Sequence, residues 1–134
     1  MVIPMNVKAC NLVELMAATV DETVLDIARK MEAKKVRQVT ILKGGKPVGI
    51  VSAVDIINKV VAAGNDPKKL KAKDIMTSPV YFCSADDAAL KTFYDMSKKN
   101  ILSCPVVENG RVIGTLTVQN VMAAVCKKGT ESCK

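Results

Sequence analysis

The chain has 134 residues, with 20 basic and 13 acidic side chains, a formal charge of +7, and neither histidine nor tryptophan. Without histidine, no Ser–His–Asp or Cys–His relay can be built, and metal sites with imidazole ligands are excluded. The sequence also has no phosphate-binding G-x-x-x-x-G-K-[ST] loop. We therefore expect a protein that is not an enzyme, requires no cofactor and holds no metal.

Hydropathy and cysteine usage predict a protein of the cytoplasm. No stretch approaches 18 uninterrupted apolar residues, and the first residues lack the basic and long apolar regions of a signal peptide. Cys83 and Cys104 lie within apolar runs, as small core residues do, and Cys10 is a third cysteine. For Cys126 and Cys133, near the end of the sequence, a disulfide with each other or with a second chain stays open.

The first half of the chain contains five predicted elements after a short apolar lead-in segment. The lead-in lies at 12–16, and the five elements are, in chain order, a strand at 18–20, a helix from 24, strands at 39–42 and 48–51, and a helix at 54–61. Apolar residues recur at i, i+3, i+4 and i+7 from Val24 to Met31, which indicates a helix that Asp21 or Thr23 could cap. The dipeptide at 44–45, Gly-Gly, is typical of a type I′ hairpin turn, in which both central residues need positive φ.

The second half repeats this order at an offset of 65 residues. The offset superposes like residues from position 21 onward, including Asp21 on Asp86, Met31 on Met96, Lys34 on Lys99, Gly45 on Gly110 and Gly49 on Gly114. The lead-ins correspond at an offset of 60, with Met16 on Met76, so the first loops differ in length by five residues. The second copy has a lead-in at 73–76, a strand at 80–83, a helix from 89, a hairpin turning at 109–110 and a helix at 118–125. A β-α-β-β-α unit of about 50 residues cannot bury both faces of its sheet alone. We therefore predict an α/β (α+β) fold in which two repeats, 11–62 and 73–126, pack sheet to sheet, with a linker at 63–72 and terminal extensions at 1–10 and 127–134.

One motif recurs where the last strand of each repeat meets the last helix. It has the form Gly-h-h-(Ser/Thr)-x-x-(Asp/Asn), with its polar positions at Ser52 and Asp55 in the first copy and at Thr117 and Asn120 in the second. One interpretation is structural, because a hydroxyl followed three residues later by an acidic or amide side chain forms a capping box. The other is functional, because a hydroxyl at a helix N-terminus suits a phosphate and a carboxylate one turn later can accept both hydroxyls of a ribose. Glycine at the strand position (Gly49 and Gly114) leaves room for close approach of a ligand, and the recurrence of the whole pattern favours the functional interpretation.

The doubled motif, the lead-in ending in Asp74-Ile75-Met76-Thr77 and the run from Asn100 to Val107 resemble a tandem pair of CBS domains, the modules named after cystathionine beta-synthase, over about residues 11–126. The resemblance implies a regulatory Bateman module that senses energy state by binding AMP, ADP, ATP or S-adenosylmethionine in a cleft between the repeats. It implies that Asp55 and Asn120 hold ribose and that Ser52 and Thr117 hold phosphate. It also implies a homodimer, acting on a separate regulated protein.

The resemblance further implies supporting residues around the adenine and the phosphate. Apolar side chains and backbone of the strands before each helix commonly enclose the adenine, and a basic residue before the first hairpin strand often reaches phosphate. The corresponding positions are Ala18, Val20, Thr77, Pro79, Val80 and, for the phosphate, Arg37. Asn120 is neutral and accepts weaker hydrogen bonds than a carboxylate, so we expect the Asp55 motif to form the better site.

A second functional interpretation rests on the lysines at 68–73. Four of these six residues are lysine, in a position that could bind nucleic acid or an acidic protein. Arginine is scarce, however, and the aromatic residues are not interleaved with the lysines, whereas nucleic-acid readers usually combine both. We therefore keep this adaptor function as the alternative to nucleotide binding.

Overall fold

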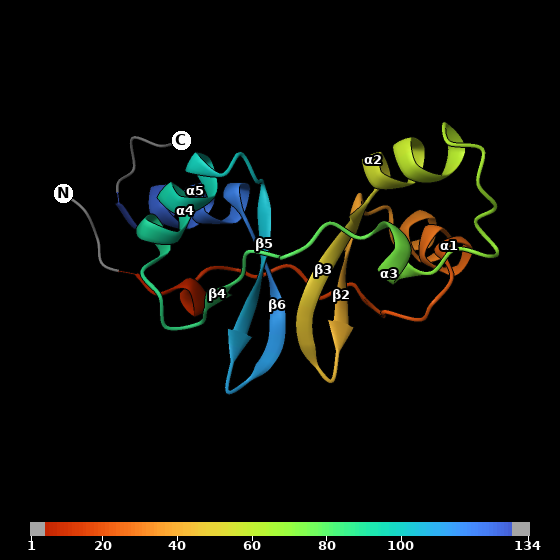
Figure 1. Cartoon of the computed structure of the whole chain (residues 1–134). Helices are drawn as coiled ribbons and strands as arrows, with labels where there is room; N and C mark the ends of the chain where they lie inside the picture. Colours follow the sequence, from red (N-terminus) through yellow and green to blue (C-terminus); the bar gives the residue numbers. More distant parts are fainter. Residues whose placement is uncertain (1–4, 130–134) are drawn as a thin grey trace. The chain divides into compact units, whose positions relative to one another are not determined.

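The computed structural model describes residues 5–129, which form two compact units (Figure 1). The middle unit runs from Met16 to Val80. The outer unit combines the residues up to Leu15 with those from Tyr81 onward. Each unit contains one three-stranded sheet, in the order β1-β2-β3 or β4-β5-β6, so the mixed α+β fold class is confirmed.

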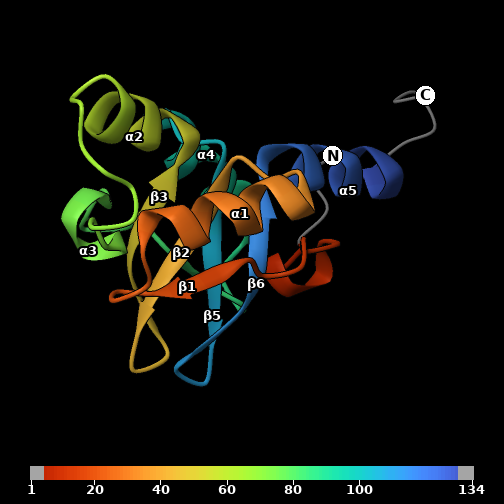
Figure 2. The same cartoon turned by 90° about the vertical axis from the view of Figure 1, so that its right-hand side faces the viewer.

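In the middle unit, a helix crosses over between two parallel strands. β1 (Ala17–Thr19) pairs in parallel with β2 (Gln38–Lys43), which pairs antiparallel with β3 (Lys46–Ser52). The intervening helix α1 (Val24–Lys34) lies across this sheet and buries the predicted apolar face (Figure 2). Of the two residues predicted to cap α1, Thr23 does so, since its Oγ1 accepts a hydrogen bond from the backbone N–H of Asp26 at 3.2 Å.

The second helix of this unit is built in two parts. α2 (Ala53–Ile56) continues directly into one π-helical turn, η2 (Ile57–Val61), in which the N–H of Ala62 donates to the carbonyl of Ile57 at 2.8 Å. The helix predicted at 54–61 is thus confirmed, but its winding changes after the first turn. The chain then leads to α3 (Ala72–Ile75), whose two end residues are buried in the core of the same unit.

The outer unit repeats the crossover and the hairpin. It contains η1 (Val7–Ala9), β4 (Cys83–Ser84), α4 (Ala89–Lys98), β5 (Ser103–Glu108), β6 (Arg111–Thr117) and α5 (Val118–Gly129). The strand expected at 80–83 is therefore shorter and lies later in the chain. β4 pairs in parallel with β5, which pairs antiparallel with β6.

Both hairpins have the predicted turn geometry. The central turn residues Gly44 and Gly45 have φ of 60° and 80°, and Asn109 and Gly110 have φ of 53° and 78°. In both hairpins the strand register also shifts at equivalent places, between Ile41 and Leu42 and between Val106 and Val107. The internal repeat therefore extends to a bulge that the sequence pattern does not reveal.

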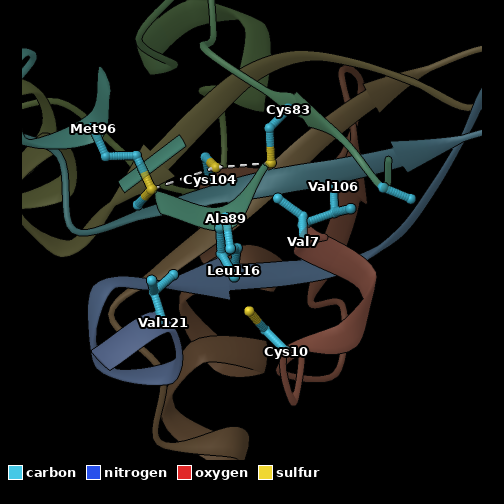
Figure 3. Packing of buried hydrophobic residues seen from close by; sticks show 10 residues of the cluster. Val7, Cys10, Cys83, Ala89, Met96, Cys104, Val106, Leu116 and Val121 are labelled. Atoms are coloured by element: carbon cyan, nitrogen blue, oxygen red, sulfur yellow. Dashed lines mark hydrogen bonds between the residues drawn. The ribbon is translucent and has the colours of Figure 1, made fainter. Parts of the chain in front are cut away.

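Sulfur atoms lie close together in the core of the outer unit (Figure 3). The Sγ atoms of Cys83 and Cys104 are 3.4 Å apart, and the Cys104 Sγ is 3.8 Å from the Sδ of Met96. Both thiols are buried, as the sequence predicts. Their hydrogen bond raises the pKa of Cys104, as burial does, and lowers that of Cys83. Cys126 is a free thiol in the structure, and Cys133, its possible partner, lies outside the described residues.

Apart from Met16, which packs against the core of the middle unit, neither lead-in segment lies in the unit that contains the rest of its own repeat. Val13, from the first lead-in, belongs to the outer unit and exchanges two backbone hydrogen bonds with Thr115 of β6, at 2.9 and 3.0 Å. Thr77, which follows the second lead-in, exchanges two with Ile50 of β3 in the middle unit, at 3.0 and 2.8 Å. Each motif strand is therefore bordered by the lead-in of the other repeat. Within the described residues, we find no helix both long and apolar enough to cross a membrane.

Candidate functional site

The predicted motif residues Ser52 and Asp55 meet at the start of α2. The Ser52 Oγ accepts a hydrogen bond from the backbone N–H of Asp55 at 3.1 Å, and the Asp55 Oδ2 accepts one from the backbone N–H of Ser52 at 2.9 Å. These reciprocal bonds form a capping box. The structural interpretation of the motif is therefore fulfilled in the first repeat, and any ligand-binding role is additional to it.

Two further side chains reach the same carboxylate. The Thr77 Oγ1 lies 3.2 Å from the Asp55 Oδ1 and 3.4 Å from its Oδ2. The Lys59 Nζ, one helical turn after Asp55, forms an ion pair with Oδ1 at 3.2 Å. Asp55 is only 9% exposed, and a buried carboxylate needs a nearby opposite charge. The Lys59 ammonium group supplies that charge. We call this group of Ser52, Asp55, Lys59 and Thr77 the Asp55 junction.

The motif in the outer unit forms a simpler arrangement at the start of α5. The Thr117 Oγ1 accepts from the backbone N–H of Asn120 at 3.0 Å and lies 2.6 Å from its Oδ1. Asn120 is half-buried, in contrast to Asp55. We call Thr117 and Asn120 the Asn120 junction.

The two motif glycines make room for the lead-in segments. A Cβ at Gly49 would lie 2.5 Å from the Sδ of Met76, and a Cβ at Gly114 would lie 3.1 Å from the carbonyl oxygen of Val13. The space beside each glycine is therefore filled by the chain itself. Packing of the protein itself accounts for glycine at both positions, so these glycines are no evidence for close approach of a ligand.

The supporting residues lie in different surroundings. The side chain of Ala18 is 4% exposed within the core of the middle unit, and Val20 is half-buried and packs against that core. Pro79 is exposed and Val80 half-buried, both just after Thr77. Arg37 has an exposed side chain, and its backbone carbonyl accepts from the N–H of Ala53 at 2.9 Å, which places it at the first turn of α2.

The lysines proposed for an adaptor function are partly paired within the unit. The Nζ atoms of Lys71 and Lys73 lie 3.9 and 3.2 Å from the Oδ1 of Asp21. Two of the four lysines in this run thus share one carboxylate, which neutralises only one of their two charges. In the part of the chain that the structure describes, no three His, Cys, Asp or Glu side chains are grouped as a metal site would require.

Sequence reasoning missed Lys59, and it assigned Thr77 to the adenine alone. The signal for Lys59 was available, because an acidic residue and a lysine at i and i+4 face each other on a helix. The Thr77 contact had no local signal, since it depends on the pairing of a distant lead-in with β3.

Comparison with known proteins identifies similar modules. A family model described as the CBS domain matches residues 11–62 and 72–127. The chain is 34% identical over 103 residues to the uncharacterized protein MK0525 of Methanopyrus kandleri, which covers 75% of this chain and 53% of that protein. It is 33% identical over 105 residues to the CBS domain-containing protein CBSCBSPB2 of Arabidopsis thaliana, covering 76% of this chain and 20% of that protein. It thus spans about half the length of the first relative and a fifth of the second.

A solved structure extends the similarity to the fold. The CBS domain pair of protein MJ0100, determined in complex with 5-methylthioadenosine and S-adenosyl-L-methionine, matches with a TM-score of 0.76 at 26% identity. The match covers 91% of this chain and 96% of that one.

Proposed function

Because the chain belongs to the CBS domain family, we propose that it is a non-catalytic regulatory module that binds an adenosine nucleotide at the Asp55 junction. The observation that carries this proposal is the Asp55 carboxylate, held three residues into α2 beside the hydroxyls of Ser52 and Thr77. A carboxylate is the side chain best suited to accept both hydroxyls of a ribose. The adenosine ligands of the MJ0100 pair support the same class of ligand.

The two junctions differ in the acceptor that they offer. Asp55 presents a charged carboxylate, whereas Asn120 presents one amide oxygen, and hydrogen bonds to a charged acceptor are roughly twice as strong. We therefore propose the Asp55 junction as the tighter site for AMP, ADP, ATP or S-adenosylmethionine. Arg37 is a supporting cation for phosphate, because its backbone lies at the first turn of α2 and its side chain is exposed.

We also propose that the module acts as a homodimer on a separate regulated protein. Three apolar side chains form an exposed stripe along α2 and η2: Val54 is 61% exposed, Ile57 56% and Val61 71%. They lie at i, i+3 and i+7, on one side of the helix. A second copy of the chain would remove this apolar surface from water.

A thermal-shift panel tests the proposed ligand class. A ligand that binds only the folded state at a hundredfold excess over its Kd stabilises that state by about 2.7 kcal/mol. We expect AMP, ADP, ATP or S-adenosylmethionine to raise the Tm, and guanine nucleotides to have less effect. Asp55→Asn should weaken the shift more than Asn120→Ala does.

Thr23→Ala is the matched control, because it removes an N-cap hydroxyl from α1 in the same unit without touching the Asp55 junction. It should lower the Tm of the ligand-free chain but leave the ligand-induced shift intact. If none of the adenosine compounds raises the Tm, the proposal is contradicted. Binding of DNA or RNA that weakens steeply with salt, without any nucleotide effect, would favour the adaptor function instead.

A further inference from the structure

Polar groups of the same unit surround the Asp55 carboxylate in the ligand-free chain. Its Oδ2 accepts from the backbone N–H of Ser52 at 2.9 Å and from the Ser52 Oγ at 3.1 Å. Its Oδ1 lies 3.2 Å from both the Thr77 Oγ1 and the Lys59 Nζ. A carboxylate has about four lone-pair positions, and here it accepts hydrogen bonds from three donors while the ion-paired Lys59 ammonium group lies beside Oδ1. A ribose hydroxyl that approaches Oδ1 must therefore displace one of these neighbouring groups.

Of these neighbouring groups, the Lys59 ammonium group can leave at the lowest cost. The two bonds from Ser52 belong to the capping box, so breaking them would uncap α2. Thr77 is held in place by its two backbone hydrogen bonds to Ile50. The Lys59 side chain is flexible and 45% exposed, and its Nζ also donates to the carbonyl of Ile75 at 2.8 Å. A displaced ammonium group therefore keeps one protein partner and gains water.

The other repeat lacks this arrangement. The residue 65 positions after Lys59 is Ala124, which has no cation to offer. The residue that pairs with the motif strand there is Val13, in the place that Thr77 takes in the middle unit. Within residues 5–129, the donor that reaches the Asn120 side-chain oxygen is the hydroxyl of Thr117. The competing cation is thus specific to the junction that carries the charged acceptor.

We propose that Lys59 competes with the ribose hydroxyls for Oδ1 of Asp55, and so sets the affinity of this junction for every ribose-bearing ligand. This inference rests on the proposed function, because it takes Asp55 as the ribose acceptor. Lys59 acts through Asp55 and is a positioning residue, which also keeps the carboxylate neutralised while no ligand is bound. Removing the ammonium group should therefore strengthen ligand binding, which is the opposite of what removing a phosphate-binding cation would do.

Calorimetric titration of the whole chain with AMP, adenosine and adenine tests the proposal. We expect Lys59→Met to tighten the binding of AMP and adenosine by about twofold to fivefold, the range that measured couplings of partly exposed ion pairs span. The Kd of adenine should not change, because adenine has no ribose. Lys46→Met removes one exposed charge from the same unit at a distance from the junction and should leave all three values as they are.

A double-mutant cycle separates competition from a general effect on folding. In the Asp55→Asn background, which removes the charge for which Lys59 competes, Lys59→Met should no longer strengthen binding. Lys59→Arg should keep the wild-type affinity, and urea unfolding of each variant checks that it is folded.

Adenosine binding that depends on Asp55 but is unchanged or weakened in Lys59→Met would overturn the role of Lys59 and leave the proposed function standing. If no adenosine compound binds either the wild-type chain or Lys59→Met, both the role of Lys59 and the proposed function are overturned.

Discussion

Replacing Gly49 with alanine tests whether the motif glycine serves packing. The new Cβ would lie 2.5 Å from the Sδ of Met76, 2.8 Å from its Cγ and 3.1 Å from its Cβ. The sulfur can swing away, but the Met76 Cβ is anchored, because the backbone N–H of Met76 donates to Ala72 and the next residue, Thr77, is paired with β3. Overpacking of this kind costs about 1–3 kcal/mol, against which removing a glycine from the unfolded chain returns about 0.4–1 kcal/mol. We expect a net loss of about 1–2 kcal/mol.

Urea unfolding followed by circular dichroism measures this loss. With a slope near 2 kcal/mol per molar urea, the midpoint of Gly49→Ala should fall by about 0.5–1 M. In a Met76→Ala background the contacts with Sδ and Cγ are gone and only the Cβ contact at 3.1 Å remains, so the same change should cost clearly less. A cost that is equal in both backgrounds, or absent from the otherwise wild-type chain, would refute the packing explanation of Gly49.

Two further predictions concern a charge and the proposed dimer. Burial acts to raise the pKa of Glu22, but hydrogen bonds from Lys30 at 2.6 Å and from the Thr19 amide at 2.8 Å outweigh it, and the pKa falls below its ordinary value of 4.5. Glu22 therefore stabilises the fold at neutral pH and loses this effect as the pH falls through its lowered pKa. In urea unfolding, the difference in unfolding free energy between wild type and Glu22→Gln should become smaller from pH 7 to pH 3. A difference that stays the same over this range would contradict the assignment. In sedimentation equilibrium, Val61→Lys should be a monomer where the wild type is a dimer, and its unfolding free energy should change by less than about 0.5 kcal/mol. A wild-type chain that sediments as a monomer would contradict the proposed dimer.

The elements that could be predicted from the sequence are those defined by local patterns. Both hairpin turns followed from the dipeptides at 44–45 and 109–110, whose residues all have positive φ. The face of α1 followed from a 3.6-residue period, and the capping box at Ser52 from a spacing of three. Each of these features depends on residues within one helix, one turn or one hairpin, which is why the sequence alone identified them.

The features that could not be predicted depend on distant pairing. Nothing local to residues 12–16 or 73–77 shows that each lead-in borders the motif strand of the other repeat. The sequence therefore suggested that Gly49 makes room for a ligand, whereas the side chain of Met76 fills the space beside this glycine. The π-helical turn after Ile56 and the strand bulge between Ile41 and Leu42 likewise have no residue signature in this sequence.

The most direct test of the central claim is nuclear magnetic resonance of the 15N-labelled chain titrated with AMP. If AMP binds at the Asp55 junction, amide shifts should concentrate at Ser52, Asp55 and Thr77, whose backbone or side-chain groups form the hydrogen bonds of this junction. Asp55→Asn should weaken these shifts at equal AMP concentration, whereas Thr23→Ala should not. Shifts confined to the lysines at 68–73, or no shifts at millimolar AMP, would contradict the assignment of this junction as a nucleotide site.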